Sequence, residues 1–128
     1  MGADLRLTRT ARTSFKRVEK LGAKLPGVEL STYFGTPALK LNGQMIACMA
    51  SHKSAEPNTL VVRVGFLERD LRVANEPDVY YLKPHYVKYA CVLARLSRIG
   101  DAALKDLLES AHSFVGKKKP SRSRATRR

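Results

Sequence analysis

The sequence TPALKLNGQMIACMAS, residues 36–51, places the pair Asn42-Gly43 between two apolar runs. A type I′ turn needs positive φ at both central residues, so this pair is the strongest short signal for a β-hairpin. Residues 37–41 and 44–51 are therefore predicted to pair as antiparallel strands. The hairpin fixes the fold class, because strands joined by short turns form an antiparallel sheet.

Helical periodicity appears on both sides of these strands. A first helix is predicted over residues 13–25, which Pro26 and Gly27 end. A second runs over residues 66–76, with Leu67, Leu71 and Ala74 on its apolar face, and ends at Pro77. A third runs over residues 101–116, and Gly116 is its expected stop. Its apolar stripe consists of Leu104, Leu107, Leu108, Ala111 and Val115.

Further strands complete the sheet. Residues 59–65 alternate in strand fashion, with Leu60, Val62 and Val64 facing inward. Two later strands, 79–83 and 87–97, are joined through the Pro84-His85-Tyr86 junction. The expected fold is α+β, a two-layer arrangement with an antiparallel sheet and the order α-β(3–4)-α-β(2)-α.

The chain is long enough for one domain, predicted over residues 13–116. Residues 1–12 are predicted to form a flexible basic arm and residues 117–128 a disordered basic tail. No apolar run approaches the length of a membrane span, and the N-terminal residues lack the apolar stretch of a secretory signal. A cytoplasmic protein without a membrane partner is expected.

Charge is the unusual quantity of this composition. Lys plus Arg number 24 against 11 Asp plus Glu, a net charge of +13. The last twelve residues hold seven of the cations and no acid, which leaves 24 − 7 − 11 = +6 for the rest of the chain. Such an excess favours polyanionic partners, and nucleic acid is the first class to consider.

Two basic surfaces follow from this pattern. Alternation along the strands points single bases away from the helices, toward a sheet face that can meet phosphates. Those residues are Lys40, Arg63, Lys83 and Arg95. The tail is the second surface, through Lys117, Lys118, Lys119, Arg122 and Arg124. The simpler alternatives are a solvated strand face and a solubilising tail. In a eukaryotic chain, "KKKP" also fits a nuclear address.

An enzymatic function finds little support. His52, His85 and His112 lie far apart in sequence, and no catalytic motif or metal-ligand spacing accompanies them. His85 near Asp78 is one candidate acid-base pair, although a packing role at the strand junction is the simpler interpretation. Cys48 and Cys91 lie in apolar runs and are expected to be reduced. No catalytic residue, metal or cofactor is expected.

The order of these motifs resembles the MmcQ/YjbR family. The matching segments, from about Phe15 to Val115, are "LPGVE", "YFGTPALKLNGQMIA", "LVVRV" and "EPDVYYLKPHYVKYACVLARL", followed by a leucine-rich helix. The resemblance implies a two-layer α+β fold similar to that of type III secretion chaperones. Members are usually labelled DNA-binding through a proposed double-wing surface, and no catalytic activity defines the family.

Position by position, the resemblance marks three turns. They are Leu25-Pro26-Gly27 after the first helix, the hairpin with Gly35, Pro37, Lys40 and Asn42-Gly43, and the Pro84-His85-Tyr86 junction. The chain departs from the family in two places. Gln44 occupies a place that is commonly basic in the family, and Cys91 lies near a place that is often aromatic.

The expected function is therefore weak, salt-dependent binding of duplex DNA without catalysis or marked sequence specificity. The cluster Lys83, His85, Tyr86 and Lys88 at one end of the sheet is expected to touch phosphate, with Tyr86 or Tyr89 available for stacking. The alternative is a protein-interaction or chaperone-like module that binds a peptide or forms a homodimer through its sheet.

Overall fold

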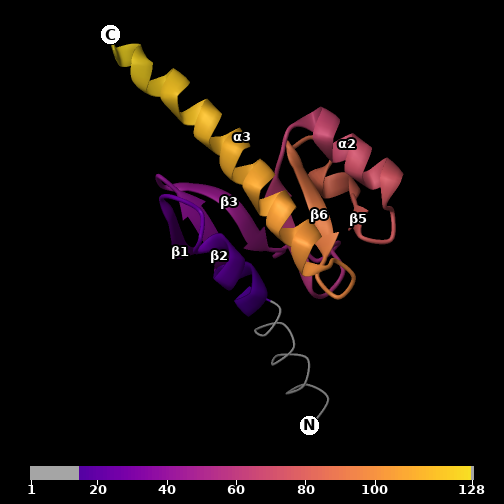
Figure 1. The fold of residues 1–128 in the computed structure, drawn as a ribbon. Coiled ribbons are helices and arrows are strands. Elements are labelled where there is room, and N and C mark those ends of the chain that lie inside the picture. Colours follow the sequence, from indigo (N-terminus) through magenta and orange to yellow (C-terminus); the bar gives the residue numbers. More distant parts are fainter. Residues whose placement is uncertain (1–14, 128) are drawn as a thin grey trace.

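The computed structural model describes residues 15–127, with side chains from 15 to 117. Residues 15–22 are helical, and the elements that follow are β1 (Val28–Tyr33), β2 (Thr36–Leu41), β3 (Gln44–Met49), β4 (Thr59–Arg63), α2 (Phe66–Asn75), β5 (Tyr80–Tyr81), the 3₁₀ turn η1 (Pro84–Tyr86), β6 (Cys91–Arg95) and α3 (Asp101–Arg127). Figure 1 shows the helices packed on one side of a curved sheet. The α+β fold with an antiparallel sheet is confirmed.

The sheet has six strands in the order β1-β2-β3-β4-β6-β5, and all neighbours are antiparallel. The predicted hairpin at Asn42-Gly43 joins β2 to β3, with a bulge between Leu39 and Lys40. The first four strands follow one another along the chain. β6 then enters between β4 and β5, so the last strands depart from a simple meander.

The main core lies between the sheet and the helices. The predicted stripe on α3 is buried, since Leu104, Leu107, Leu108, Ala111 and Val115 are at most 1% exposed. Leu60 and Val62 on β4, and Val64 directly after it, face this core, as predicted. Phe15 and Val18 of the first helix complete it. Burial of these apolar side chains is the main driving force that holds the two layers together.

A second, smaller cluster lies on the opposite face of the sheet. It contains Ala38, Cys48, Val61, Tyr81, Tyr86, Cys91 and Leu93. The loop 50–58 and the turn η1 cover part of this face, because Tyr86 is only 7% exposed and the Tyr81 hydroxyl accepts from the Glu56 N–H at 2.8 Å. We call this surface, away from the helices, the outer face. The loop 50–58 and the turn η1 cover part of the outer face, and the rest of it is open to solvent.

Three predicted elements differ from the structure. The strand predicted over residues 87–97 begins only at Cys91, because residues 87–90 continue the turn of η1 with the Tyr89 N–H bonded to the Tyr86 carbonyl oxygen at 3.0 Å. The strand predicted over 79–83 is reduced to Tyr80–Tyr81. The predicted helix stop at Gly116 is wrong. α3 continues to Arg127, so the backbone of residues 117–127 is helical where a disordered tail was expected.

Helix α2 begins at the predicted residue and ends one residue early, at Asn75, but its orientation is unexpected. Its predicted apolar face points to solvent, with Leu67 74% and Leu71 52% exposed, whereas Arg69 is buried. The cause is polar. The guanidinium of Arg72 bonds Glu68, the Tyr80 hydroxyl, Asp106 and Ser110, and so ties α2 to β5 and α3.

Candidate functional site

A groove of about 620 Å³ runs over the outer face of the sheet. Its floor is made of Met45, Cys48, Val61 and Cys91, from three neighbouring strands. The rest of its lining is Tyr33, Phe34, Gly43, Gln44, Ser51, Arg63, His85, Tyr86, Tyr89 and Ala90. Among residues 15–117, no acidic residue contributes to this lining. The groove is therefore apolar and aromatic, with a positive charge and no negative one.

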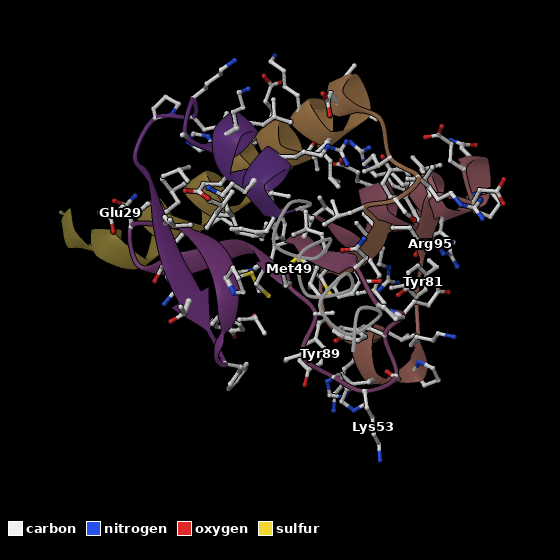
Figure 2. The ribbon with its side chains drawn as sticks, turned by 90° about the horizontal axis from the view of Figure 1, so that it is seen from below. Glu29, Met49, Lys53, Tyr81, Tyr89 and Arg95 are labelled. Atoms are coloured by element: carbon white, nitrogen blue, oxygen red, sulfur yellow. The ribbon has the colours of Figure 1, made fainter. Side chains whose placement is uncertain are left out.

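Aromatic rings stand around the groove at accessible positions. Phe34 is 80% exposed, Tyr89 49% and Tyr33 38%. The rings of Tyr33 and Phe34 touch edge to face with centroids 4.7 Å apart, at the turn between β1 and β2. Tyr89 projects from the opposite wall, and Figure 2 shows it at the same end of the molecule as Lys53. These rings can stack against a planar ligand.

Arg63 supplies the positive charge of the lining. It lies at the end of β4, opposite Cys91 in the β4–β6 ladder. Its Nη1 donates to the Met45 carbonyl oxygen at 3.3 Å. Among the side chains of residues 15–117, none forms an ion pair with it. A guanidinium carries five N–H donors, so Arg63 retains donors for an anion in the groove.

Helix α2 holds the wall that carries Tyr89. The Nη1 of the buried Arg69 donates to the Val87 carbonyl oxygen at 2.7 Å and to that of Tyr89 at 3.3 Å. The same guanidinium lies 4.8 Å from the centroid of the Phe66 ring. Sequence reasoning missed this positioning role, because a helical arginine normally faces solvent.

Two histidines join the loop 50–58 to the turn η1. The rings of His52 and His85 stack with centroids 3.6 Å apart and an angle of 11°. Nδ1 of His52 accepts the Ser54 N–H at 3.1 Å, which favours the neutral ring. Partial burial of the ring, together with the neighbouring His85 and Lys53, lowers the pKa of His52. His85 therefore meets a second imidazole, and not the Asp78 carboxylate considered from sequence.

The two cysteines at the floor are free and buried. Burial raises the pKa of each thiol to about 11, and the nearness of Cys91 adds to the effect on Cys48. Both are therefore neutral thiols at physiological pH. They contribute to the apolar floor of the groove.

The basic residues predicted for the outer face lie there in different settings. Lys40, Arg63 and Arg95 share the face by strand register. Lys40 stands directly opposite Glu29 of β1, which offsets its charge. Lys83 lies beyond β5, with its Nζ 5.9 Å from the centroid of the Tyr81 ring.

Arg95 is occupied by contacts within the fold. Its guanidinium makes two bonds of 2.8 Å to the Glu56 carboxylate and donates to the carbonyl oxygens of Pro77 and Asp78. It also stacks 4.2 Å from the centroid of the Tyr81 ring, and Figure 2 shows the two side chains together. The hydrogen bond and charge of Arg95 lower the pKa of Glu56. Arg95 is thus poorly placed to meet phosphate.

The remaining predicted residues form a rim and a tail. Lys88 is exposed, with its Nζ 5.6 Å from the centroid of the Tyr89 ring, and His85 and Tyr86 line the groove. Lys117 is exposed on α3. The side chains of Lys118, Lys119, Arg122 and Arg124, and the predicted arm 1–12, lie outside the described residues.

The third histidine, His112, lies away from the groove. Its Nε2 is 2.7 Å from the Pro26 carbonyl oxygen, and the side chain packs the end of the first helix against α3. Within the described part of the chain, no group of three His, Cys, Asp or Glu side chains is arranged to hold a metal ion. No helix there combines the length and the apolarity that crossing a membrane requires.

Comparison with known proteins supports the fold. No family model and no curated protein matches the sequence. Among solved structures, the fold is similar to that of the Deinococcus radiodurans protein DR2400, a protein with a DUF419 domain. The two share 19% identity with a TM-score of 0.64, over 80% of this chain and 78% of that one. At this identity the likeness shows the fold alone.

Proposed function

We propose that this protein binds DNA without catalysing a reaction, mainly through electrostatic contacts with phosphate. The observation that carries the proposal is the acid-free groove on the outer face, which holds Arg63 and has Lys53 and Lys88 near one end. The basic residues beyond Gly116 add positive charge in the C-terminal part of α3. Basic surfaces of this kind supply affinity for phosphates but little sequence specificity.

We also infer membership of the MmcQ/YjbR family. Two independent features support it. The sequence carries the order of turns described above, from "LPGVE" to the Pro84-His85-Tyr86 junction. The fold is similar to that of a DUF419 protein. The double-wing surface proposed for that family agrees with a DNA-binding role. The proposal made here rests on the charge of the groove and does not depend on that surface.

The test is the salt dependence of binding. The observed binding constant of the full chain for a short duplex, followed by fluorescence anisotropy, should fall steeply as salt rises from about 50 to 200 mM. Replacing Lys117, Lys118, Lys119, Arg122 and Arg124 by glutamine should flatten the slope by about one unit for each phosphate that the tail neutralises in the wild type. Binding that is absent at low salt, or independent of salt, would refute the proposal.

The alternative of self-association is tested in the same samples. Light scattering gives the molar mass of the free protein. A dimer that buries the outer face would exclude DNA from the groove. In that case the protein would bind DNA only at concentrations low enough for the dimer to dissociate into monomers. A monomer that binds DNA excludes this alternative.

A further inference from the structure

Two hairpin turns of this sheet have the same backbone but different residues. Asn42-Gly43, between β2 and β3, has φ values of 53° and 82°. Phe34-Gly35, between β1 and β2, has φ values of 52° and 79°. Both satisfy the requirement of a type I′ turn, and asparagine or aspartate is the residue type preferred at the first position. Phe34 thus occupies a position that disfavours it.

The fold does not compensate for this residue. A non-glycine residue in the left-handed region is strained, because its Cβ crowds the following carbonyl oxygen, unless a short polar side chain relieves the strain. Phe34 has no such group, and its ring is 80% exposed, so burial contributes little. Backbone strain that packing does not require is a feature of binding sites. The ring of Phe34 lines the groove, together with Tyr33.

The length and chemistry of the groove identify a ligand class. From Ser51 to Met45, two lining residues near opposite ends of β3, the chain spans roughly 20 Å at about 3.3 Å per residue. The aromatic groups Phe34 and His85 gather toward the Ser51 end and Arg63 lies toward Met45. The aromatic side chains at one end of the groove can stack on planar bases, and the guanidinium of Arg63 at the other end can bind a phosphate. This arrangement complements a chain of planar bases joined by phosphates.

We propose that the groove binds the unpaired bases of single-stranded DNA, with Phe34 and Tyr89 as stacking platforms and Arg63 as a phosphate contact. This inference rests on the proposed function and specifies the form of DNA that the groove takes. A duplex keeps the faces of its bases stacked inside the helix and presents only its backbone and base edges, so the exposed rings of the groove could not stack on a base. A single strand presents its bases and its phosphates together.

The decisive variant is Phe34→Asn, which makes the first turn a copy of Asn42-Gly43. The variant should unfold at a higher temperature, because asparagine is favoured at this turn position. It should bind a labelled oligo-dT of about fifteen nucleotides at least about fivefold more weakly, since one base–aromatic stack is removed. A residue with only a structural role would not change stability and affinity in opposite directions.

Controls separate the groove from the rest of the surface. Leu71→Asn, which changes a 52% exposed side chain on α2, should leave the affinity for oligo-dT unchanged. Tyr89→Leu is a second groove variant on the opposite wall and should weaken binding of the single strand as Phe34→Asn does. Wild type should bind oligo-dT more tightly than a duplex of equal length at the same salt concentration.

The outcomes distinguish this inference from the proposed function. If duplex and oligo-dT both bind in a salt-dependent way but Phe34→Asn and Tyr89→Leu leave the affinity for oligo-dT unchanged, the groove inference is wrong and the electrostatic proposal stands. Tighter binding of the duplex, or equal losses on both DNA forms, also overturns it. Absence of binding to either form overturns both.

Discussion

Single arginines in this protein serve two different purposes. Arg17 bonds Asp101 and the carbonyl oxygens of Leu96 and Ile99, and Arg69, Arg72 and Arg95 make similar networks in other places. Each joins segments that are distant in sequence and satisfies carbonyl or carboxylate oxygens. Arg63 differs, because it makes a single long bond to a carbonyl oxygen and faces an acid-free groove.

A matched pair of variants tests this difference. Arg95→Gln should lower the free energy of unfolding by about 1–2 kcal/mol, because it removes charge-assisted bonds to Glu56. It should change the affinity for DNA less than twofold. Arg63→Gln should leave thermal stability nearly unchanged but weaken DNA binding and reduce its salt slope by about one unit. Thermal unfolding and anisotropy titrations measure both. The reverse pattern would show that Arg95 is the phosphate contact.

The sequence could place these residues on a face but could not say what they bind. Alternation correctly put Lys40, Arg63 and Arg95 on the outer face. The partners of Arg95 come from the loop 50–58 and from residues 77–78, whose positions depend on the whole fold. The sequence did not indicate the left-handed conformation of Phe34, and here the missing information was local. Phenylalanine is not a turn residue, so Gly35 was the only local sign of its conformation.

At the scale of elements, α3 shows why a glycine does not always end a helix. Gly116 lies in the interior of α3 over β2, and a Cβ added there would meet Leu41 Cδ2 at 3.7 Å, an ordinary contact. Gly22, in the first helix, is different, because a Cβ there would collide with a Cδ atom of Leu39. Close packing therefore requires a glycine at position 22 but not at position 116.

Alanine substitutions distinguish the two glycines. Gly116→Ala should raise the free energy of unfolding by about 0.5–1 kcal/mol, because alanine has the higher helix propensity and space exists for the methyl group. Gly22→Ala should lower it by about 1–3 kcal/mol through overpacking. Denaturant unfolding followed by circular dichroism measures both. Destabilisation by Gly116→Ala would mean that the helix ends there in a left-handed residue.

Elements with a strong local signal were predictable, and those set by tertiary contacts were not. The hairpin at Asn42-Gly43 and the stripe of α3 follow from turn chemistry and period. The late start of β6 does not, because Val87 and Tyr89 have strand-forming side chains, but their carbonyl oxygens bond Arg69 of α2. The orientation of α2 could not be predicted from the sequence either. The hydrogen bonds of Arg72 to Tyr80 and Asp106 hold the helix with its apolar residues facing solvent.

At the scale of the whole molecule, one sheet carries two apolar clusters. The larger lies under the helices and the smaller on the outer face, where Cys48 of β3 and Cys91 of β6 are 5% and 4% exposed. The two strands are separated by β4 in the sheet. Their thiols therefore report on whether the smaller apolar cluster stays packed across the strands β3, β4 and β6.

Alkylation of these thiols should be slow in the native protein and should rise with pH toward about 11, the pKa of both groups. A raised thiol pKa keeps the unreactive protonated form, so at pH 8 only roughly a thousandth is thiolate. Iodoacetamide labelling followed by mass spectrometry measures the rates. Native rates equal to those in denaturant would contradict the burial of the two thiols.

The position of β6 between β4 and β5 also determines the order in which the sheet can assemble. Strands β1 to β4 pair with sequence neighbours and can form as soon as they leave the ribosome. β4 then keeps an unpaired edge until Cys91–Arg95 arrives, after the whole of α2 has been synthesised. Because such non-local pairing is slow, we expect it to limit the folding rate. The same exposed edge is where nascent chains would join one another, so aggregation during synthesis should begin at β4.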